Sequence, residues 1–144
     1  MTDSLLEPRH CVSNNLHKTA RAVTRIYAEE MRPAGLARSQ FAILNVLETA
    51  GPQAISALAE HLFMDRTTLT RNLKPLRSAG LISRQTSTTD ARVALIAITP
   101  EGRRKVRQAR RYWRRAQARM LQMFGETQWR ALERTLRELR ALVS

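Results

Sequence analysis

What this sequence lacks narrows the class of protein that it encodes. Its 144 residues include one cysteine, Cys11, which excludes an intrachain disulfide and a zinc site made of several cysteines. No apolar run approaches the roughly 18–20 residues of a membrane span, and the first ten residues lack the basic-then-apolar layout of a signal peptide. The length suits one domain, with or without helical extensions. We therefore expect a cytoplasmic protein that does not associate with a membrane.

The residue patterns of catalysis are also missing. No nucleophile stands in a motif with a nearby base, no glycine-rich phosphate loop is present, and the histidines show no metal-ligand spacing. The sequence therefore predicts a protein that is not an enzyme and that needs no metal or cofactor.

Acidic residues are scarce, and basic residues are concentrated. The chain has 25 Lys and Arg against 12 Asp and Glu, a formal charge of +13 and a pI near 11.6. Such a chain suits nucleic acid, an anionic membrane or acidic partners. Residues 65–92 carry net +4 and residues 100–119 carry net +8, so two segments hold +12 of the +13. Charge focused in this way favours a binding surface, with a solvated face as the alternative.

Glycines and hydrophobic periodicity predict the order of the elements. Gly35, Gly51, Gly80 and Gly125 stand where periodic helical stretches stop, as left-handed helix caps do. Helices are expected at about 10–32, 38–49, 54–61, 65–79, 100–123 and 126–143. Two strands, 81–86 and 93–99, flank a polar loop. The predicted fold is mainly α with a small two- to three-stranded antiparallel β-wing.

The helix predicted at 65–79 has the composition of a DNA-reading helix. Asp65 is placed to cap it, and the short helix before it, joined through Phe63 and Met64, completes a helix-turn-helix. One face carries Leu69, Leu73 and Leu76. The other faces carry arginine forks and hydroxyls, which suit base edges and phosphates. Pro75 lacks the amide hydrogen that a helix interior uses, so we expect a kink there with the reading residues before it.

Apolar stripes mark the two ends of the chain. Residues in 12–26, 106–123 and 129–143 recur at alternating three- and four-residue spacing, the seam pattern of helices that pack along their length. A small domain cannot readily bury three such stripes. We expect a dimer interface there, the alternative being an intramolecular bundle. Its predicted residues are Leu16, Val23, Trp129, Leu132, Leu136, Leu139 and Val143.

The order of these elements resembles the MarR (multiple antibiotic resistance regulator) family over about residues 10–143. The motifs that carry the resemblance are Leu69-Thr70-Arg71, Ala79-Gly80-Leu81-Ile82, Asp90-Ala91-Arg92 and Ile98-Thr99-Pro100-Glu101-Gly102. The resemblance implies a winged helix-turn-helix regulator, usually a homodimeric repressor that binds a pseudo-palindromic operator in duplex DNA. It implies a dimerisation helix in 1–34, a DNA-binding domain in 35–99 and further dimerisation helices in 100–144.

The resemblance also assigns residues to DNA. Arg92 is similar to the wing arginine that enters the minor groove, and Asp90 to the acid that holds it. Thr68, Thr70 and Arg71 resemble groove and phosphate contacts. Charge and helix phase add further residues, and Ser39 is expected either to cap its helix or to touch a phosphate. The remaining predicted contacts are Arg66, Thr67, Lys74 and Arg84.

A small-molecule effector, aromatic or anionic, is a further implication of the resemblance. Many family members release DNA when such a compound binds between the dimer helices and the winged domain. Candidate lining residues, each of which has a core role as its alternative, are Cys11, His17, Tyr27, Arg38, Met64, Tyr112 and Trp113. Other members sense oxidants through an N-terminal cysteine. Cys11 stands in about that place, with His10, Arg9 and Lys18 near enough in sequence to stabilise a thiolate; the alternative is an inert thiol.

Two questions remain open at the level of sequence. The arginine-rich segment 103–119 either pairs with acidic residues, namely the partner's Glu29, Glu30, Glu133 or Glu138, or binds an anionic effector. The whole chain is either a sequence-specific regulator or a weakly specific architectural DNA-binding protein. The threonine-rich reading helix and the dimer stripes favour the regulator.

Overall fold

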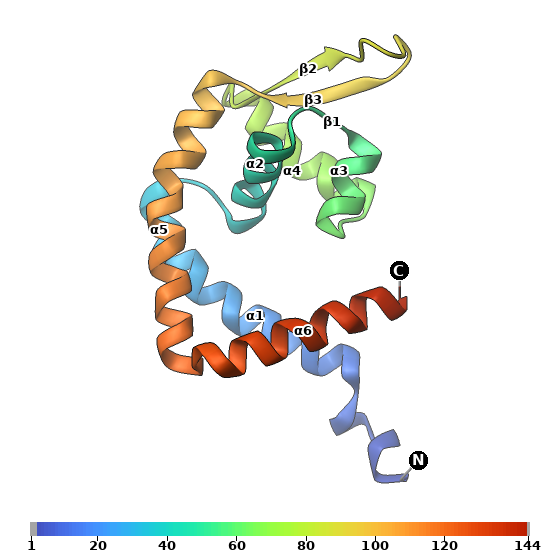
Figure 1. Ribbon diagram of the computed structural model, residues 1–144, viewed down its shortest axis with the longest axis vertical. Helices are drawn as coiled ribbons and strands as arrows, with labels where there is room; N and C mark the ends of the chain where they lie inside the picture. The colour runs from blue at the N-terminus through green and yellow to red at the C-terminus, as the bar shows by residue number, and fades with distance from the viewer. Residues whose placement is uncertain (1–2, 144) are drawn as a thin grey trace. The chain divides into compact units, whose positions relative to one another are not determined.

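The computed structural model describes residues 3–143 and shows a mainly helical chain with one small sheet (Figure 1). Residues 1, 2 and 144, which the predicted domain boundaries include, lie outside the described residues. The helices are α1 Val12–Met31, α2 Arg38–Ala50, α3 Ile55–Leu62, α4 Arg66–Ser78, α5 Pro100–Phe124 and α6 Glu126–Val143. The strands are β1 Gln53–Ala54, β2 Ile82–Thr86 and β3 Ala94–Ile98. Short 3-10 helices occupy Asp3–Leu6, Pro8–His10 and Arg32–Ala34.

The predicted helices are confirmed, each to within two residues at its ends. Glycines with positive φ follow α2, α4 and α5, as predicted, whereas Gly35, also with positive φ, ends the short 3-10 helix that comes after α1. After α4, for example, Gly80 has φ 70° and lets the chain turn directly into β2.

The chain divides into two compact units. The winged-helix unit is Met31–Tyr112, and the helical unit comprises the chain up to Glu30 and from Trp113 onward. Helix α5 begins in the first and continues into the second. The winged-helix unit therefore extends past residue 99, the end of the predicted DNA-binding domain.

The sheet of the winged-helix unit is antiparallel, with strand order β1-β3-β2. In β2 and β3, Ile82 faces Ile98 and Thr86 faces Ala94 across the ladder. The short β1 adds Gln53 opposite Ile96. The mainly α fold with its small β-wing is thus confirmed, and the third strand is the one whose place the sequence did not indicate.

Helices α2, α3 and α4 pack together beside this sheet, and the β2–β3 hairpin extends past them (Figure 1). The predicted apolar face of α4 is buried: Leu69, Leu73 and Leu76 are each less than 5% exposed. They meet a core of large aliphatic side chains from α2, α3 and the sheet. These side chains include Ile43, Leu44, Leu47, Leu58 and Ile96.

The start of α5 is held close to the sheet by a glycine. A Cβ at Gly102 would lie 2.1 Å from the Leu81 carbonyl oxygen and 2.8 Å from Ile98 Cγ1. The residue before α5, Thr99, donates its hydroxyl to the Gly80 carbonyl at 2.7 Å and accepts from the Gly102 amide at 3.0 Å. The predicted hydroxyl cap is present, and the Thr-Pro-Glu-Gly sequence reflects a helix start that only glycine can fit.

The helical unit buries very little. Among its described residues only Ala116 is buried, and α6 has no buried residue at all. The expectation that the whole 106–123 stripe faces a partner is wrong in part, because Val106 and Ala109 are buried inside the winged-helix unit. Between residues 3 and 143, no helix has the length and apolar character needed to cross a membrane.

Candidate nucleic-acid interface

The turn between α3 and α4 sets the start of the reading helix. Phe63 adopts a left-handed conformation with φ 50°, and its amide and that of Met64 bond back to α3 carbonyls. Asp65 then caps α4, as predicted: its carboxylate accepts from the Thr68 amide at 2.8 Å and from the Thr68 hydroxyl at 2.5 Å. These hydrogen bonds, the hydroxyl first, lower the pKa of Asp65, so the cap is ionised near neutral pH.

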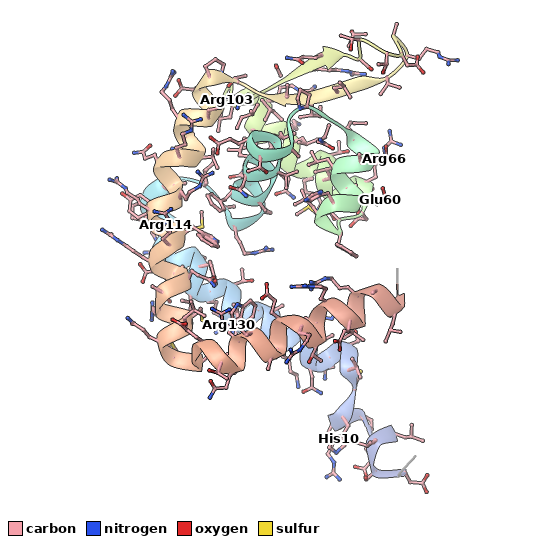
Figure 2. The ribbon with its side chains drawn as sticks, viewed as in Figure 1. His10, Glu60, Arg66, Arg103, Arg114 and Arg130 are labelled. Atoms are coloured by element: carbon pink, nitrogen blue, oxygen red, sulfur yellow. The ribbon has the colours of Figure 1, made fainter. Side chains whose placement is uncertain are left out.

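The exposed face of α4 forms an open depression of about 720 Å³. Five predicted DNA-contact residues line it together, namely Arg66, Thr67, Thr70, Arg71 and Lys74. Figure 2 labels Arg66 at the N-terminal end of this helix. Guanidinium and ammonium groups supply positive charge, and hydroxyls supply both donors and acceptors, so the depression has the chemistry of a duplex-binding surface.

This surface continues past the proline. Helix α4 runs as one element to Ser78 with Pro75 inside it, and Arg77 and Ser78 line the same depression. The surface therefore extends beyond the point at which the sequence placed its end. The spacing in the sequence indicates this larger surface. At intervals of three and four positions, one helix face carries residues 67, 70, 71, 74, 77 and 78.

Two of the predicted DNA-contact residues, Ser39 and Thr68, use their hydroxyl groups in hydrogen bonds within the protein. Besides Thr68, whose hydroxyl completes the Asp65 cap, the Ser39 hydroxyl donates to Asn72 Oδ1 at 2.7 Å. Asn72 in turn donates its amide to the Thr68 carbonyl at 2.9 Å. Ser39 does not cap α2, since the residue at that position is Ala37. Ser39 and Asn72 instead fasten the reading helix to α2.

The loop between β2 and β3 presents an arginine held by an acid. The Asp90 carboxylate accepts from the Arg92 amide at 3.0 Å and from its Nε at 3.2 Å. The Arg92 bonds, the side chain's first, lower the pKa of Asp90. The Arg92 side chain is nonetheless 91% exposed, so its guanidinium is oriented and still accessible. Arg84 is exposed on β2, opposite Ile96 in the ladder.

Part of the arginine-rich segment pairs within the chain. Glu48, whose side chain is only 9% exposed, binds Arg107 Nε and Arg110 Nη2 at 2.6 Å each. Burial alone would raise the pKa of Glu48, but the two arginines outweigh it and the pKa is lowered. Arg119 lies 3.2 Å from Glu29 and 3.4 Å from Glu30 of the same chain. These two acids are thus paired without a second copy, contrary to one expectation from the sequence.

The predicted effector residues are divided between the two units. Arg38, Met64 and Tyr112 belong to the winged-helix unit, and the Arg111 guanidinium lies 4.6 Å from the Tyr112 ring centroid. Cys11, His17, Tyr27 and Trp113 belong to the helical unit. Cys11 is exposed, and its sulfur accepts a long contact of 3.5 Å from the Asn14 amide. His17 Nδ1 lies 2.9 Å from the Ser13 carbonyl oxygen.

The predicted dimer residues are all left at least partly exposed by the single chain. Val23, Trp129, Leu136 and Leu139 are half-buried. The others, Leu16, Leu132 and Val143, are exposed.

A helix-turn-helix with a basic face, followed by a hairpin that presents an arginine, defines a winged helix-turn-helix DNA-binding protein. Comparison with known proteins agrees. The sequence model of the MarR family matches residues 36–94. The uncharacterized HTH-type transcriptional regulator YwoH of Bacillus subtilis (strain 168) is 30% identical over 97 residues, which cover 67% of this chain and 69% of YwoH.

Solved structures agree as well. The M. tuberculosis transcriptional regulator MosR, in complex with DNA, is 32% identical with a TM-score of 0.81, and the match covers 92% of this chain and 96% of MosR. Bordetella bronchiseptica BpsR, whose DNA binding is regulated by 6-hydroxynicotinic acid, is 18% identical with a TM-score of 0.84 over 93% of this chain and 96% of BpsR; it shares the fold. The chain belongs to the MarR family, whose members are DNA-binding transcriptional regulators.

Proposed function

We propose that this protein is a cytoplasmic homodimeric repressor that binds a pseudo-palindromic operator near its own gene and releases it when a small molecule binds. The observation that carries the proposal is the pairing of two surfaces: a basic, hydroxyl-rich face on α4 beside an arginine-tipped wing, and apolar helices that the chain leaves uncovered.

The α4 face reads the major groove in this proposal. Arg71 and Arg66 supply forks for guanine edges, while Thr67 and Thr70 reach bases or phosphates and Lys74 neutralises a phosphate. Arg77 and Ser78 join them, because they line the same depression. Arg92 enters the adjacent minor groove, and Arg84 contacts the backbone beside it. Ser39 and Thr68 are better described as residues that position α4.

In this proposal residues 35–99 bind DNA, and residues 1–34 and 100–144 dimerise, except at the start of α5, where Val106 and Ala109 are buried in the winged-helix unit. The support for the dimer is energetic: exposed Leu132 and Val143 and half-buried Leu136 and Leu139 all lie on one 18-residue helix. Covering such side chains contributes about 25 cal/mol per Å² of apolar area. Two copies related by a two-fold axis would also place two reading helices on two operator half-sites.

The test is a binding titration of the pure protein on duplex DNA from just upstream of its own gene. Scrambled DNA serves as the control, at one near-physiological salt concentration, since affinity for DNA depends steeply on salt. We expect a preference of about a thousandfold or more for the upstream DNA. Equal binding to both would reject the autoregulatory repressor and favour the weakly specific architectural protein.

A second candidate, oxidant sensing, is favoured by the position of Cys11. The thiol is exposed directly before α1, and the Asn14 amide of the first helical turn points at its sulfur. An exposed thiol is one that an oxidant in solution can reach. Peroxide should then release operator DNA from the wild-type protein and not from Cys11→Ser. Equal release from both proteins would reject oxidant sensing through this residue.

A further inference from the structure

A second basic surface lies on α5, apart from the depression on α4. Its members are four exposed arginines in the part of α5 that belongs to the winged-helix unit, and we call them the α5 arginine face: Arg103, Arg104, Arg107 and Arg111. Intervals of three and four positions place them on one side of the helix, over about 12 Å of its length. Figure 2 labels Arg103 at the start of α5.

The α5 arginine face is separate from the surface that reads DNA. None of its four residues lines the depression on α4. Helix α2 packs against α4 and is bonded to α5 through Glu48, and Figure 1 shows it between the two.

Two acids neutralise part of this charge. Glu101 pairs with Arg104, and Glu48 pairs with Arg107 and with Arg110, a half-buried arginine next to the face. Three guanidinium groups therefore share two carboxylates, which leaves one positive charge uncompensated.

The other two arginines of the face add their full charge. Arg111 bonds to the hydroxyl of Tyr112 and lies over its ring, so its partner is uncharged. Among the described residues, neither Arg103 nor Arg111 forms an ion pair with a carboxylate. The surface thus keeps three uncompensated positive charges. Like charges four positions apart on a helix, such as Arg103 and Arg107, lower its stability, and an anion from outside the chain would remove this cost.

The chemistry of the face selects among anionic partners. Between residues 100 and 112 no large apolar side chain is exposed, because Val106 and Ala109 are fully buried. A membrane surface requires an apolar helix face that can insert, and a protein interface has an apolar centre. Single-stranded nucleic acid requires aromatic side chains on which its bases stack, whereas Tyr112 is half-buried and covered by Arg111. A small anion is too short to meet four guanidinium groups spread over about 12 Å.

Duplex DNA matches this surface in charge density and in chemistry. It carries about one negative charge per 1.7 Å of its axis, so a stretch as long as the arginine face presents about seven. Guanidinium groups bind phosphate oxygens through paired N–H donors. Contacts to phosphates hold a duplex without reading its sequence.

We infer that the α5 arginine face is a second DNA-binding surface, which holds the phosphate backbone of duplex DNA outside the segment that α4 reads. That DNA is either the flank of the same molecule or a second duplex, since both present the same phosphates. This surface goes beyond the proposed function, because it binds DNA next to or apart from the operator and without sequence preference.

Binding of the full-length protein to a long scrambled duplex, measured over a range of salt concentrations, tests the surface. The glutamine variant combines Arg103→Gln, Arg104→Gln and Arg111→Gln, and it leaves Arg107 bonded to Glu48. The slope of log affinity against log salt should become shallower by about 2–3, since each lost phosphate contact removes about 0.9. Affinity at near-physiological salt should fall about tenfold or more. Affinity for a duplex no longer than the operator should change by less than about threefold, and an equally large loss there would overturn the separation of the two surfaces.

The first control removes three charges from the helical unit instead. Helix α6 has three exposed arginines that lie away from its apolar stripe. They are Arg130, Arg134 and Arg137. Changing all three to Gln should leave the salt slope as it is in the wild type. A loss equal to that of the glutamine variant would show that net charge rather than a surface is responsible, and would overturn the inference.

The second control keeps the charge of the face. Arg103→Lys, Arg104→Lys and Arg111→Lys together should preserve the slope, because the slope counts neutralised phosphates. A lysine variant that loses as much as the glutamine variant would show that the packing of α5 was altered, and would overturn the inference. A glutamine variant that binds scrambled DNA with the wild-type slope would do the same.

Two further arms distinguish a flank from a second duplex. In the first, a bare operator duplex is immobilised, saturated with protein and offered labelled scrambled duplex. Retention of the label by the wild type and not by the glutamine variant would identify a second duplex. In the second, scrambled flanks are added to the operator, and tighter binding by the wild type alone would identify the flank.

No difference between the wild type and the glutamine variant in either arm would overturn the inference. A protein with no operator preference would refute the proposed function instead. The titration on scrambled duplex would still test the α5 arginine face in that case, because it needs no operator.

Discussion

The two compact units treat the same kind of sequence pattern in opposite ways. Both contain amphipathic helices with regular apolar stripes. In the winged-helix unit the apolar stripes of α2, α3 and α4 are buried in one core with the sheet. Among the described residues of the helical unit, every apolar side chain except Ala116 remains at least partly exposed. The winged-helix unit thus has the buried apolar core that a domain needs to fold independently, and the helical unit lacks one among its described residues.

The difference shows that an apolar stripe in the sequence predicts that a helix face will be buried, but does not indicate which surface will cover it. Helix α5 contains both outcomes: Val106 and Ala109 are fully buried in the winged-helix unit, while Met123 near its C-terminal end is 67% exposed. Hydrophobic burial is non-directional and depends only on area removed from water. A stripe left open in one chain is therefore stabilised by a second surface, which we propose to be another copy.

The largest effect is expected from a substitution on the uncovered apolar stripe of α6. Leu136→Arg puts a charge in the proposed seam, and leaving a buried charge unpaired costs about 3–5 kcal/mol. We expect monomers at concentrations where the wild type is dimeric, together with loss of operator binding. Sedimentation equilibrium and the operator titration measure the two effects.

A matched control adds the same charge to the other face of the helix. Ala141 is exposed and lies almost opposite Leu136 on α6. Ala141→Arg should leave both the mass and the operator affinity unchanged. A Leu136→Arg protein that remains dimeric would move the interface away from this stripe.

A smaller effect is expected when a buried leucine of the winged-helix unit and an exposed leucine of the helical unit are each shortened to alanine. Leu47 is fully buried in the winged-helix unit, whereas Leu142 on α6 is 81% exposed. Leu47→Ala should lower the free energy of unfolding by about 2–5 kcal/mol through lost contacts and a cavity. Leu142→Ala should change it by less than about 0.5 kcal/mol. Urea unfolding at one protein concentration compares them, and equal losses would show that the helical unit buries Leu142 against a partner.

The wing separates DNA recognition from assembly. Arg92→Ala should weaken operator binding by about 1–3 kcal/mol, the scale of one base-reading contact, and should leave the dimer intact. Arg9→Ala, which removes an exposed charge from the helical unit, is the control. Affinity that does not change in Arg92→Ala would remove the wing from the reading surface.

Local signals explain why so much of the fold was predictable. Several helix ends carry a chemical cue, such as Asp65 before α4, Thr99 before α5 and Gly80 after α4, and these cues depend on neighbours in sequence. Strand β1 carries no such cue. Its two residues, Gln53 and Ala54, are a strand only because β3 pairs with them some forty residues later.

The candidate site was less predictable for the same reason. Helical periodicity alone determines which residues of α4 share the DNA-binding face, so Arg71 and Lys74 could be predicted. Pro75 suggested that this face ends there, but in the structure it continues to Ser78. Ser39 looked like a cap or a phosphate contact, and its hydroxyl is instead taken by Asn72 on another helix. An apolar cavity in the helical unit is lined by residues of α1, α5 and α6, and no spacing within one helix indicates it.

The smallest expected effect concerns the ion cluster that joins α2 to the start of α5. Glu48→Gln keeps the shape and removes the charge that Arg107 and Arg110 share, and we expect a loss of about 1 kcal/mol in the free energy of unfolding at pH 7. The pKa of Glu48 is lowered from 4.5 in the folded protein, so its stabilising effect is present above pH 4.5 and is lost as the pH falls through the lower, folded value. The wild-type advantage over Glu48→Gln should therefore shrink between pH 6 and pH 3, as measured by urea unfolding. Glu60→Gln, which changes an exposed acid on α3, should differ little from wild type at either pH. A wild-type advantage at Glu48 that does not shrink as the pH falls would mean that the charge shared with Arg107 and Arg110 is not its source.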